Sequence, residues 1–153
     1  MDLRLGLIEV DGLDAQRILT SLLATVSYDV VMLSGVSFGG FNIVDLKLLA
    51  RKVGRPVIAV IRERPDNKAV RGALRKHFDD WRERWRKVKN AGRLYSCKPM
   101  ADEPKLYFEV GGCSPASARR IIVSSSTVSR LPEPIRVAGI LAKGLRLLPL
   151  KNP

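Results

Sequence analysis

Three carboxylates near the start of the chain are the side chains best placed for catalysis. Glu9, Asp11 and Asp14 fall where a predicted first strand meets a predicted first helix. Ligands of α/β proteins bind beyond the carboxyl ends of strands, and paired carboxylates there can hold Mg²⁺ for phosphodiester hydrolysis. Alternatively, Asp11 or Asp14 favours the amino end of the helix, where the helix dipole stabilises negative charge. The spacing alone favours this structural alternative.

The segment GVSFG, from Gly35 to Gly39, matches the G-x-S-x-G pattern of a serine hydrolase. Such an enzyme also needs a histidine base, and His77 is the one histidine of the chain. His77 falls on or near the apolar side of a predicted helix, which is a poor position for a base. A glycine-rich turn, or a weak phosphate-binding loop before a helix, accounts for the segment better.

A strongly basic stretch runs from Arg62 to Lys98. It contains 13 Lys and Arg against 5 Asp and Glu, so it carries most of the chain's formal net charge of +12. A concentrated positive surface attracts nucleic acid through counterion release and electrostatic steering. Arg62 and Arg64 follow a predicted strand, whereas Arg71 and Arg75 flank the apolar side of a predicted helix. The alternative is a solvated helix face without a ligand.

Two tryptophans in the same helix could stack on bases, but their spacing indicates another role. Trp81 and Trp85 continue a helical series that also contains Val70, Leu74 and Phe78. Side chains at steps of three or four form one apolar stripe. The pattern therefore predicts that both indoles belong to the core.

The predicted elements alternate between strand and helix, which is typical of a mostly parallel sheet covered by helices. Predicted caps are Asn42, Asp66 and Ser114, the last followed by proline at the first helical position. The predicted strands are Leu3–Val10, 29–33, 56–61 and a hairpin of 94–97 with 106–110. The predicted helices are 13–25, 42–53, 67–91, 115–123 and one from Pro134 to about Leu147.

Length and composition suit one domain over residues 1–153. Hydrophobic residues make up 46% of the chain, enough for a core of this size. No apolar run approaches the roughly 20 residues of a membrane span, and the amino terminus does not resemble a secretory signal. Two cysteines are too few for a disulfide framework or a zinc site. We expect a cytoplasmic protein with free thiols and no membrane partner.

Four segments carry a resemblance in combination. They are VDGLDA (10–15), MLSGVSFGGFNIVDL (32–46), GRPVIAVIRERPD (54–66) and RLPEPIRVAGILAKGL (130–145). Together they resemble the archaeal uncharacterised protein family related to endonuclease V. The resemblance implies a ribonuclease H-like α/β fold, with a mixed, mostly parallel sheet, helices on both faces, and the family's N-terminal strands missing from this chain.

The resemblance also implies where catalytic residues would lie. In endonuclease V, a metal-dependent site cuts nucleic acid near deaminated bases. Its Glu position falls on Asp14, its strand-end Asp on Ser34 and its last-helix ligand on Gly139. The Asp of the first strand has no counterpart, as if the chain begins about one strand pair too late. A serine and a glycine are not charged metal ligands, so this site is expected to be degraded.

We therefore expect a nucleic-acid-binding protein with an endonuclease V-like fold and a degraded catalytic site, with little or no catalysis. The candidate nucleic-acid-binding residues are Arg62, Arg64, Arg71, Arg75 and Arg136. One alternative is an active Mg²⁺-dependent endonuclease on deaminated or structured nucleic acid, with Asp11 and Asp14 as catalytic residues and Asp14 as metal ligand. Another is a structural protein, or one whose basic helix binds an acidic protein. Magnesium is expected only if the chain is active.

The same resemblance raises an expectation about assembly. If the family's central first strand has no counterpart here, a sheet edge would be left unpaired, and unpaired edges associate with other strands. We expect the chain to form homo-oligomers through an exposed sheet edge.

Overall fold

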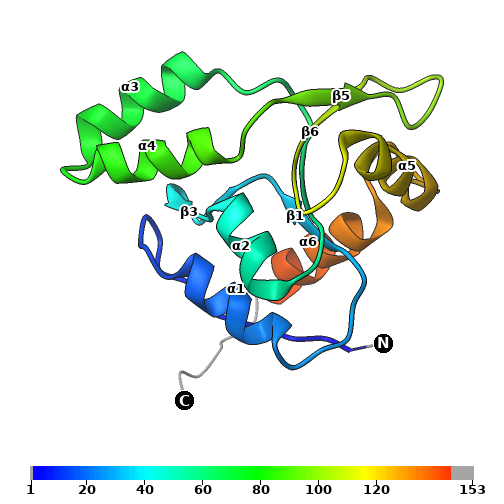
Figure 1. Cartoon of the computed structure of the whole chain (residues 1–153), viewed down its shortest axis with the longest axis horizontal. Coiled ribbons are helices and arrows are strands. Elements are labelled where there is room, and N and C mark those ends of the chain that lie inside the picture. The colour runs from blue at the N-terminus through cyan, green and yellow to red at the C-terminus, as the bar shows by residue number, and fades with distance from the viewer. Residues whose placement is uncertain (1, 146–153) are drawn as a thin grey trace.

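The computed structural model describes residues 2–145 and shows a mixed sheet with helices on both faces (Figure 1). Its four strands follow the order β1-β4-β6-β5. The strands are β1 (Val31–Ser34), β4 (Val57–Ile61), β5 (Tyr95–Cys97) and β6 (Leu106–Gly111), and β2 (Ser37–Phe38) with β3 (Asn42–Ile43) forms a separate hairpin. The helices are α1 (Ala15–Leu23), α2 (Leu46–Val53), α3 (Asn67–His77), α4 (Trp81–Asn90), α5 (Pro115–Ser125) and α6 (Glu133–Leu145).

The sheet confirms the predicted mixed α/β architecture, but it is less parallel than expected. β1 and β4 are parallel, whereas β4 pairs with β6 and β6 with β5 in antiparallel fashion. The reason lies in the connections: β5 and β6 form the predicted hairpin, and that hairpin returns beside β4 in the opposite direction.

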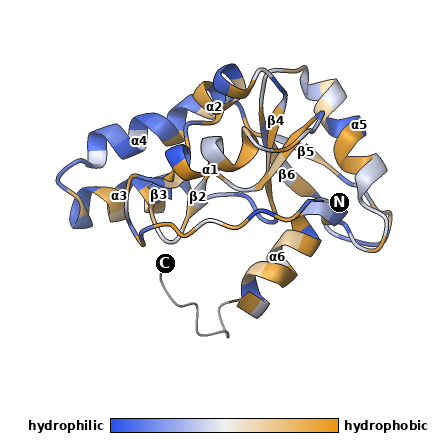
Figure 2. Ribbon diagram, turned by 90° about the horizontal axis from the view of Figure 1, so that it is seen from below, coloured by the Kyte–Doolittle hydropathy of each residue, from blue (hydrophilic) through white to orange (hydrophobic). Residues whose placement is uncertain are grey.

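Strand β4 is buried on both faces because its sequence, VIAVI, is apolar throughout. One face packs under α1 and α2, and its core includes Leu33, Val57, Ala59, Leu46 and Leu49. The other face packs under α5 and α6, and its core includes Ile58, Val60, Phe108, Ile122 and Ile135. The hydrophobic colouring of these elements follows the two layers (Figure 2).

Two of the three predicted helix caps are confirmed. The Asp66 carboxylate accepts hydrogen bonds from the Lys68 and Ala69 amides at 3.0 Å, and Ser114 caps α5 ahead of Pro115. The third prediction is wrong, because Asn42 lies buried in β3 and α2 begins later. Asp45 caps α2 instead, accepting from the Leu48 amide at 3.0 Å.

The predicted helix over residues 67–91 is two helices. The backbone of Phe78 is extended, with φ −136° and ψ 128°, and α4 begins after Asp80. Asp79 and Asp80 are poor helix formers at this point, and the Phe78 ring packs edge-on against Phe41 with centroids 5.6 Å apart. As a result α3 and α4 form a helical hairpin (Figure 1).

The predicted strand Leu3–Val10 is also wrong, because residues 2–9 pair with no strand in the described structure. This segment runs along α1, where Gly6 lies directly against Ile18 and Leu22. The side chains of Leu3, Leu5 and Leu7 are more than half exposed. The alternation that predicted a strand is present, but a strand also needs a hydrogen-bonded neighbour.

The remaining elements lie close to their predicted positions, and the predicted end of the last helix near Leu147 lies outside the described residues. No helix between residues 2 and 145 has the length and apolar character needed to cross a membrane.

Candidate functional site

Asp14 is held in a hydrogen-bonded cluster at the start of α1. Its carboxylate accepts from the side-chain amide of Asn42 at 2.6 Å and from the backbone N–H of Glu9 at 3.2 Å. Asn42 is fully buried, and its carbonyl oxygen accepts from the Ala15 amide at 3.0 Å. The Asn42 hydrogen bond, aided by that of Glu9, holds the pKa of Asp14 below its usual value. Asp14 therefore joins the first turn to the β2–β3 hairpin.

Asp11 has a similar structural role on the other side of this turn. Its φ of 56° lies in the left-handed region, and its carboxylate accepts from the Phe41 amide at 2.8 Å. The Asp11 amide in turn donates to the carbonyl of Gly39 at 2.8 Å. A Cβ at Gly40, where φ is 83°, would collide with the Asp11 carboxylate. The paired glycines thus let the hairpin approach the turn.

The carboxylates fit this structural role better than a metal site. Within residues 2–145, no group of three or more His, Cys, Asp or Glu side chains could hold a metal ion. Ser34 lies exposed at the end of β1, and Gly139 lies exposed on α6. Because serine is uncharged and glycine has no side chain, neither position supplies a charged metal ligand. Of the implied ligand positions within the described residues, only Asp14 carries a charged side chain.

The GVSFG segment is a β-hairpin rather than a nucleophile elbow. Ser37 lies in β2, which leads to β3 and not directly into a helix, and its hydroxyl donates to the carbonyl of Gly40. His77 is the last, exposed residue of α3. The turn of this hairpin lies at Gly39 and Gly40, as the glycine-rich interpretation predicted.

A buried arginine attaches the α3–α4 hairpin to this turn. Arg84 is 5% exposed and its guanidinium donates to the carbonyls of Gly12 at 3.0 Å and Phe41 at 2.8 Å. It also pairs with Asp80 at 2.8 Å and lies over the Phe78 ring at 4.3 Å. One side chain thus fixes the start of α4, the first turn and the β2–β3 hairpin together.

The outer surface of the helical hairpin is cationic. Arg71, Arg75 and Arg82 are exposed, and their guanidinium carbons lie 6.0, 5.6 and 4.7 Å from the centre of the Trp81 ring. None of the three forms an ion pair with a carboxylate among the described residues. The structure therefore brings together Arg71 and Arg75 as the sequence predicted, and it adds Arg82.

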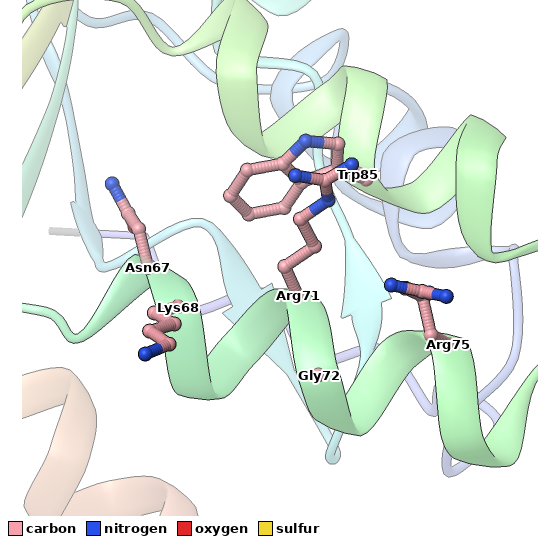
Figure 3. Close-up of a pocket in the computed structure, with 6 residues that line it drawn as sticks. All are labelled: Asn67, Lys68, Arg71, Gly72, Arg75 and Trp85. Atoms are coloured by element: carbon pink, nitrogen blue, oxygen red, sulfur yellow. The ribbon is translucent and has the colours of Figure 1, made fainter.

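A groove of about 510 Å³ opens between α3 and α4 (Figure 3). It is lined by Asn67, Lys68, Arg71, Gly72, Arg75 and Trp85. Both tryptophans are only half-buried, so the prediction that they belong entirely to the core was wrong in part. Each indole is partly covered by the helical hairpin and partly accessible to solvent.

The other predicted arginines lie elsewhere. Arg62 and Arg64 are exposed beyond the end of β4, as expected from their place in the sequence. Arg136 lies on α6 and forms a two-pronged pair with Glu133, with the closest contact at 2.7 Å. That pair lowers the pKa of Glu133 and raises that of Arg136. Because its charge is already matched, Arg136 is the weakest of the predicted phosphate ligands.

Sequence reasoning missed two buried charged residues. Arg84 lies within a run of similar basic residues, and only its spacing four residues after Asp80 hints at a difference. Glu109 lies opposite Ala59 in the middle of the sheet and is 9% exposed. Burial raises the pKa of Glu109 to about 7. The segment LYFEVG reads as an apolar strand, and nothing in it marks Glu109 as inward-facing.

Comparison with known proteins gives a consistent result along nearly the whole chain. The family described as Endonuclease dU matches residues 2–146. The UPF0215 protein of Methanothermobacter thermautotrophicus is 40% identical over 144 residues, which cover 92% of this chain and 69% of that protein. The UPF0215 protein of Thermococcus gammatolerans is 41% identical over 141 residues, covering 90% and 70%.

Two solved structures are similar to the fold. A protein of unknown function from Archaeoglobus fulgidus has a TM-score of 0.81 and 28% identity, covering 90% of this chain and 78% of its own. Endonuclease V from Bacillus subtilis has a TM-score of 0.53 and 15% identity, covering 86% and 57%. The second likeness concerns the fold alone, and it confirms the predicted endonuclease V-like fold.

Proposed function

The chain belongs to the family described as Endonuclease dU, and on that premise we propose that it binds nucleic acid through the α3–α4 hairpin, with a degraded catalytic site. The observation that carries the proposal is the group of three exposed arginines around Trp81, none of them paired with a carboxylate among the described residues. An arginine without a carboxylate partner can contact phosphate without first breaking an ion pair, and each such contact releases counterions condensed on the nucleic acid. The ring also limits their movement, which reduces the entropy lost on binding.

The degraded site is supported by the positions of the candidate ligands. Ser34 and Gly139 stand where the resemblance implies charged groups, and both are exposed. Asp14 and Asp11 are engaged by backbone and side-chain donors of the turn. These hydrogen bonds account for both carboxylates without a metal.

Binding is tested by charge reversal with a matched control. We expect Arg71→Glu combined with Arg75→Glu to weaken binding of a fluorescent single-stranded oligonucleotide at least about 10-fold at low salt. The control is Arg51→Glu combined with Lys52→Glu, which makes the same change in charge in the last turn of α2. Equal losses in both variants would mean that only net charge matters, and no loss in either would refute the hairpin as the binding surface.

An active endonuclease is the alternative that the family description itself suggests. Its test is incubation of deoxyuridine- or inosine-containing strands with Mg²⁺ or Mn²⁺. We expect no cleavage above that of an Asp14→Ala variant. Cleavage that requires the added metal, and that Asp14→Ala abolishes while circular dichroism shows the variant to be folded, would establish an active metal-dependent site. Failure to bind nucleic acid at all would favour an acidic protein partner for the basic hairpin.

We further propose that the chain self-associates through the edge of β1 and works in the cytoplasm. β1 pairs with β4 on one side only. Val31 and Gly35 donate to Pro56 and Val60 on the β4 side, so the intervening Met32 amide points away from β4. An outward row of backbone groups favours pairing with a second strand. Both cysteines are free, as is usual for proteins of a reducing compartment.

A further inference from the structure

The groove between α3 and α4 has features that phosphate binding alone does not require. Its volume of about 510 Å³ is similar to that of other surface hollows among the described residues, so its lining rather than its size distinguishes it. Trp85 lines it from α4, while Arg71 and Arg75 rise from α3 (Figure 3). An aromatic surface and cations therefore border the same space.

We propose that this groove accepts one unpaired base of a single-stranded nucleic acid, stacked on Trp85, while Arg71 and Arg75 hold the adjoining phosphates. The inference rests on the proposed function, and it specifies the form of nucleic acid that the hairpin binds. Bases within a duplex are stacked on each other and offer only their edges in the grooves. A base can reach an indole ring face only when it is unpaired and unstacked.

Trp85, rather than Trp81, is the available ring. Three guanidinium groups lie over Trp81, and they would have to move before a base could stack there. Within residues 2–145, no arginine or lysine makes such a contact with Trp85, which is half-buried and borders the groove. Two of the arginines over Trp81, Arg71 and Arg75, also line the open space next to Trp85.

Gly72 keeps the groove open. A Cβ built on Gly72 meets no atom within 4 Å, so the space beside this turn of α3 is empty. Glycine in the interior of a helix costs about 1 kcal/mol relative to alanine. A larger residue here would be tolerated by the fold and would fill the groove without altering its charge.

The experiment compares two strands that differ only in their bases. Affinity is measured for a fluorescent thymidine 12-mer and for a 12-mer of abasic sites, which keeps the phosphates and lacks the bases. Trp81→Phe leaves Trp85 as the one tryptophan, since the chain contains two, so quenching then reports on Trp85 directly. We expect the base-bearing strand to bind about 10-fold more tightly and to quench Trp85 fluorescence.

Gly72→Leu tests the groove itself, with Ala69→Leu as its control. Ala69 is exposed on α3 and does not line the groove. We expect Gly72→Leu to abolish the preference for bases while abasic binding persists, and Ala69→Leu to retain the preference. Equal affinity of the unsubstituted protein for both strands, without quenching, would overturn the base site and leave phosphate binding intact. Binding of neither strand would overturn the proposed function as well.

Discussion

At the scale of single residues, hydrogen bonding and burial shift the pKa values of two carboxylates in opposite directions. Asp14 is stabilised as an anion by hydrogen bonds, whereas Glu109 is destabilised as an anion by burial. The sequence predicted a structural role for Asp11 or Asp14 from their place before a helix. It could not predict the Asn42 contact, because Asn42 lies 28 residues further along the chain.

Glu109 should make the stability of the protein depend on pH. Its pKa is about 7 in the folded state and 4.5 in the reference state. Between these values the unfolded chain releases a proton that the folded chain keeps, so the free energy of unfolding falls as pH rises. We expect the stability of Glu109→Gln, relative to the unsubstituted protein, to increase by about 2–3 kcal/mol between pH 5 and pH 8.

Urea unfolding at the two pH values measures this difference. Glu63→Gln is the control, since Glu63 is exposed beyond β4, and we expect its effect to be the same at both. If the free energies of unfolding of Glu109→Gln and the unsubstituted protein differed by the same amount at both pH values, burial would not raise the pKa of Glu109.

At the scale of elements, apolar periodicity predicted where most helices and strands lie, and long-range partners decided the exceptions. β4 is apolar throughout and was placed within a residue of its observed bounds. The break between α3 and α4 depends on Phe78 packing against Phe41, which no local pattern reveals. The segment before α1 has the alternation of a strand and no neighbour to pair with in the described structure.

Arg84 should be the strongest single contact of the helical hairpin. Arg84→Leu leaves the carbonyls of Gly12 and Phe41 without this donor and Asp80 without its ion-pair partner. We expect a loss of about 3 kcal/mol in the free energy of unfolding. Arg86→Leu, at an exposed position of the same helix, should change it by less than about 0.5 kcal/mol. Equal free energies of unfolding for the two variants would show that Arg84 does not fix the helical hairpin to the first turn.

At the scale of the whole molecule, the positively charged surface and the unpaired sheet edge lie on different parts of the fold. The basic helical hairpin extends from the sheet, as the arrangement of α3 and α4 shows (Figure 1), whereas β1 lies at the sheet's edge. The charge surplus predicted the first surface from the sequence. The open sheet edge was expected only from the resemblance, because local sequence patterns do not specify the order of strands in a sheet.

Light scattering should detect self-association of these 153 residues. We expect a dimer or larger species at micromolar concentration, and a monomer for Met32→Pro. Proline removes the amide that points away from β4, which edge strands tolerate. Met32→Ala is the control for losing the Met32 side chain from the core under α5 and α6, and we expect it to remain associated. A monodisperse monomer of the unsubstituted chain would rule out pairing through this edge.

The most direct test of the central claim is the salt dependence of single-strand binding. Each phosphate contact contributes about 0.7 to the slope of log K against log salt concentration. Replacing both Arg71 and Arg75 with alanine should therefore reduce the magnitude of that slope by about 1.4. An unchanged slope in the double variant, or a flat slope for the unsubstituted protein, would contradict nucleic-acid binding by the α3–α4 hairpin.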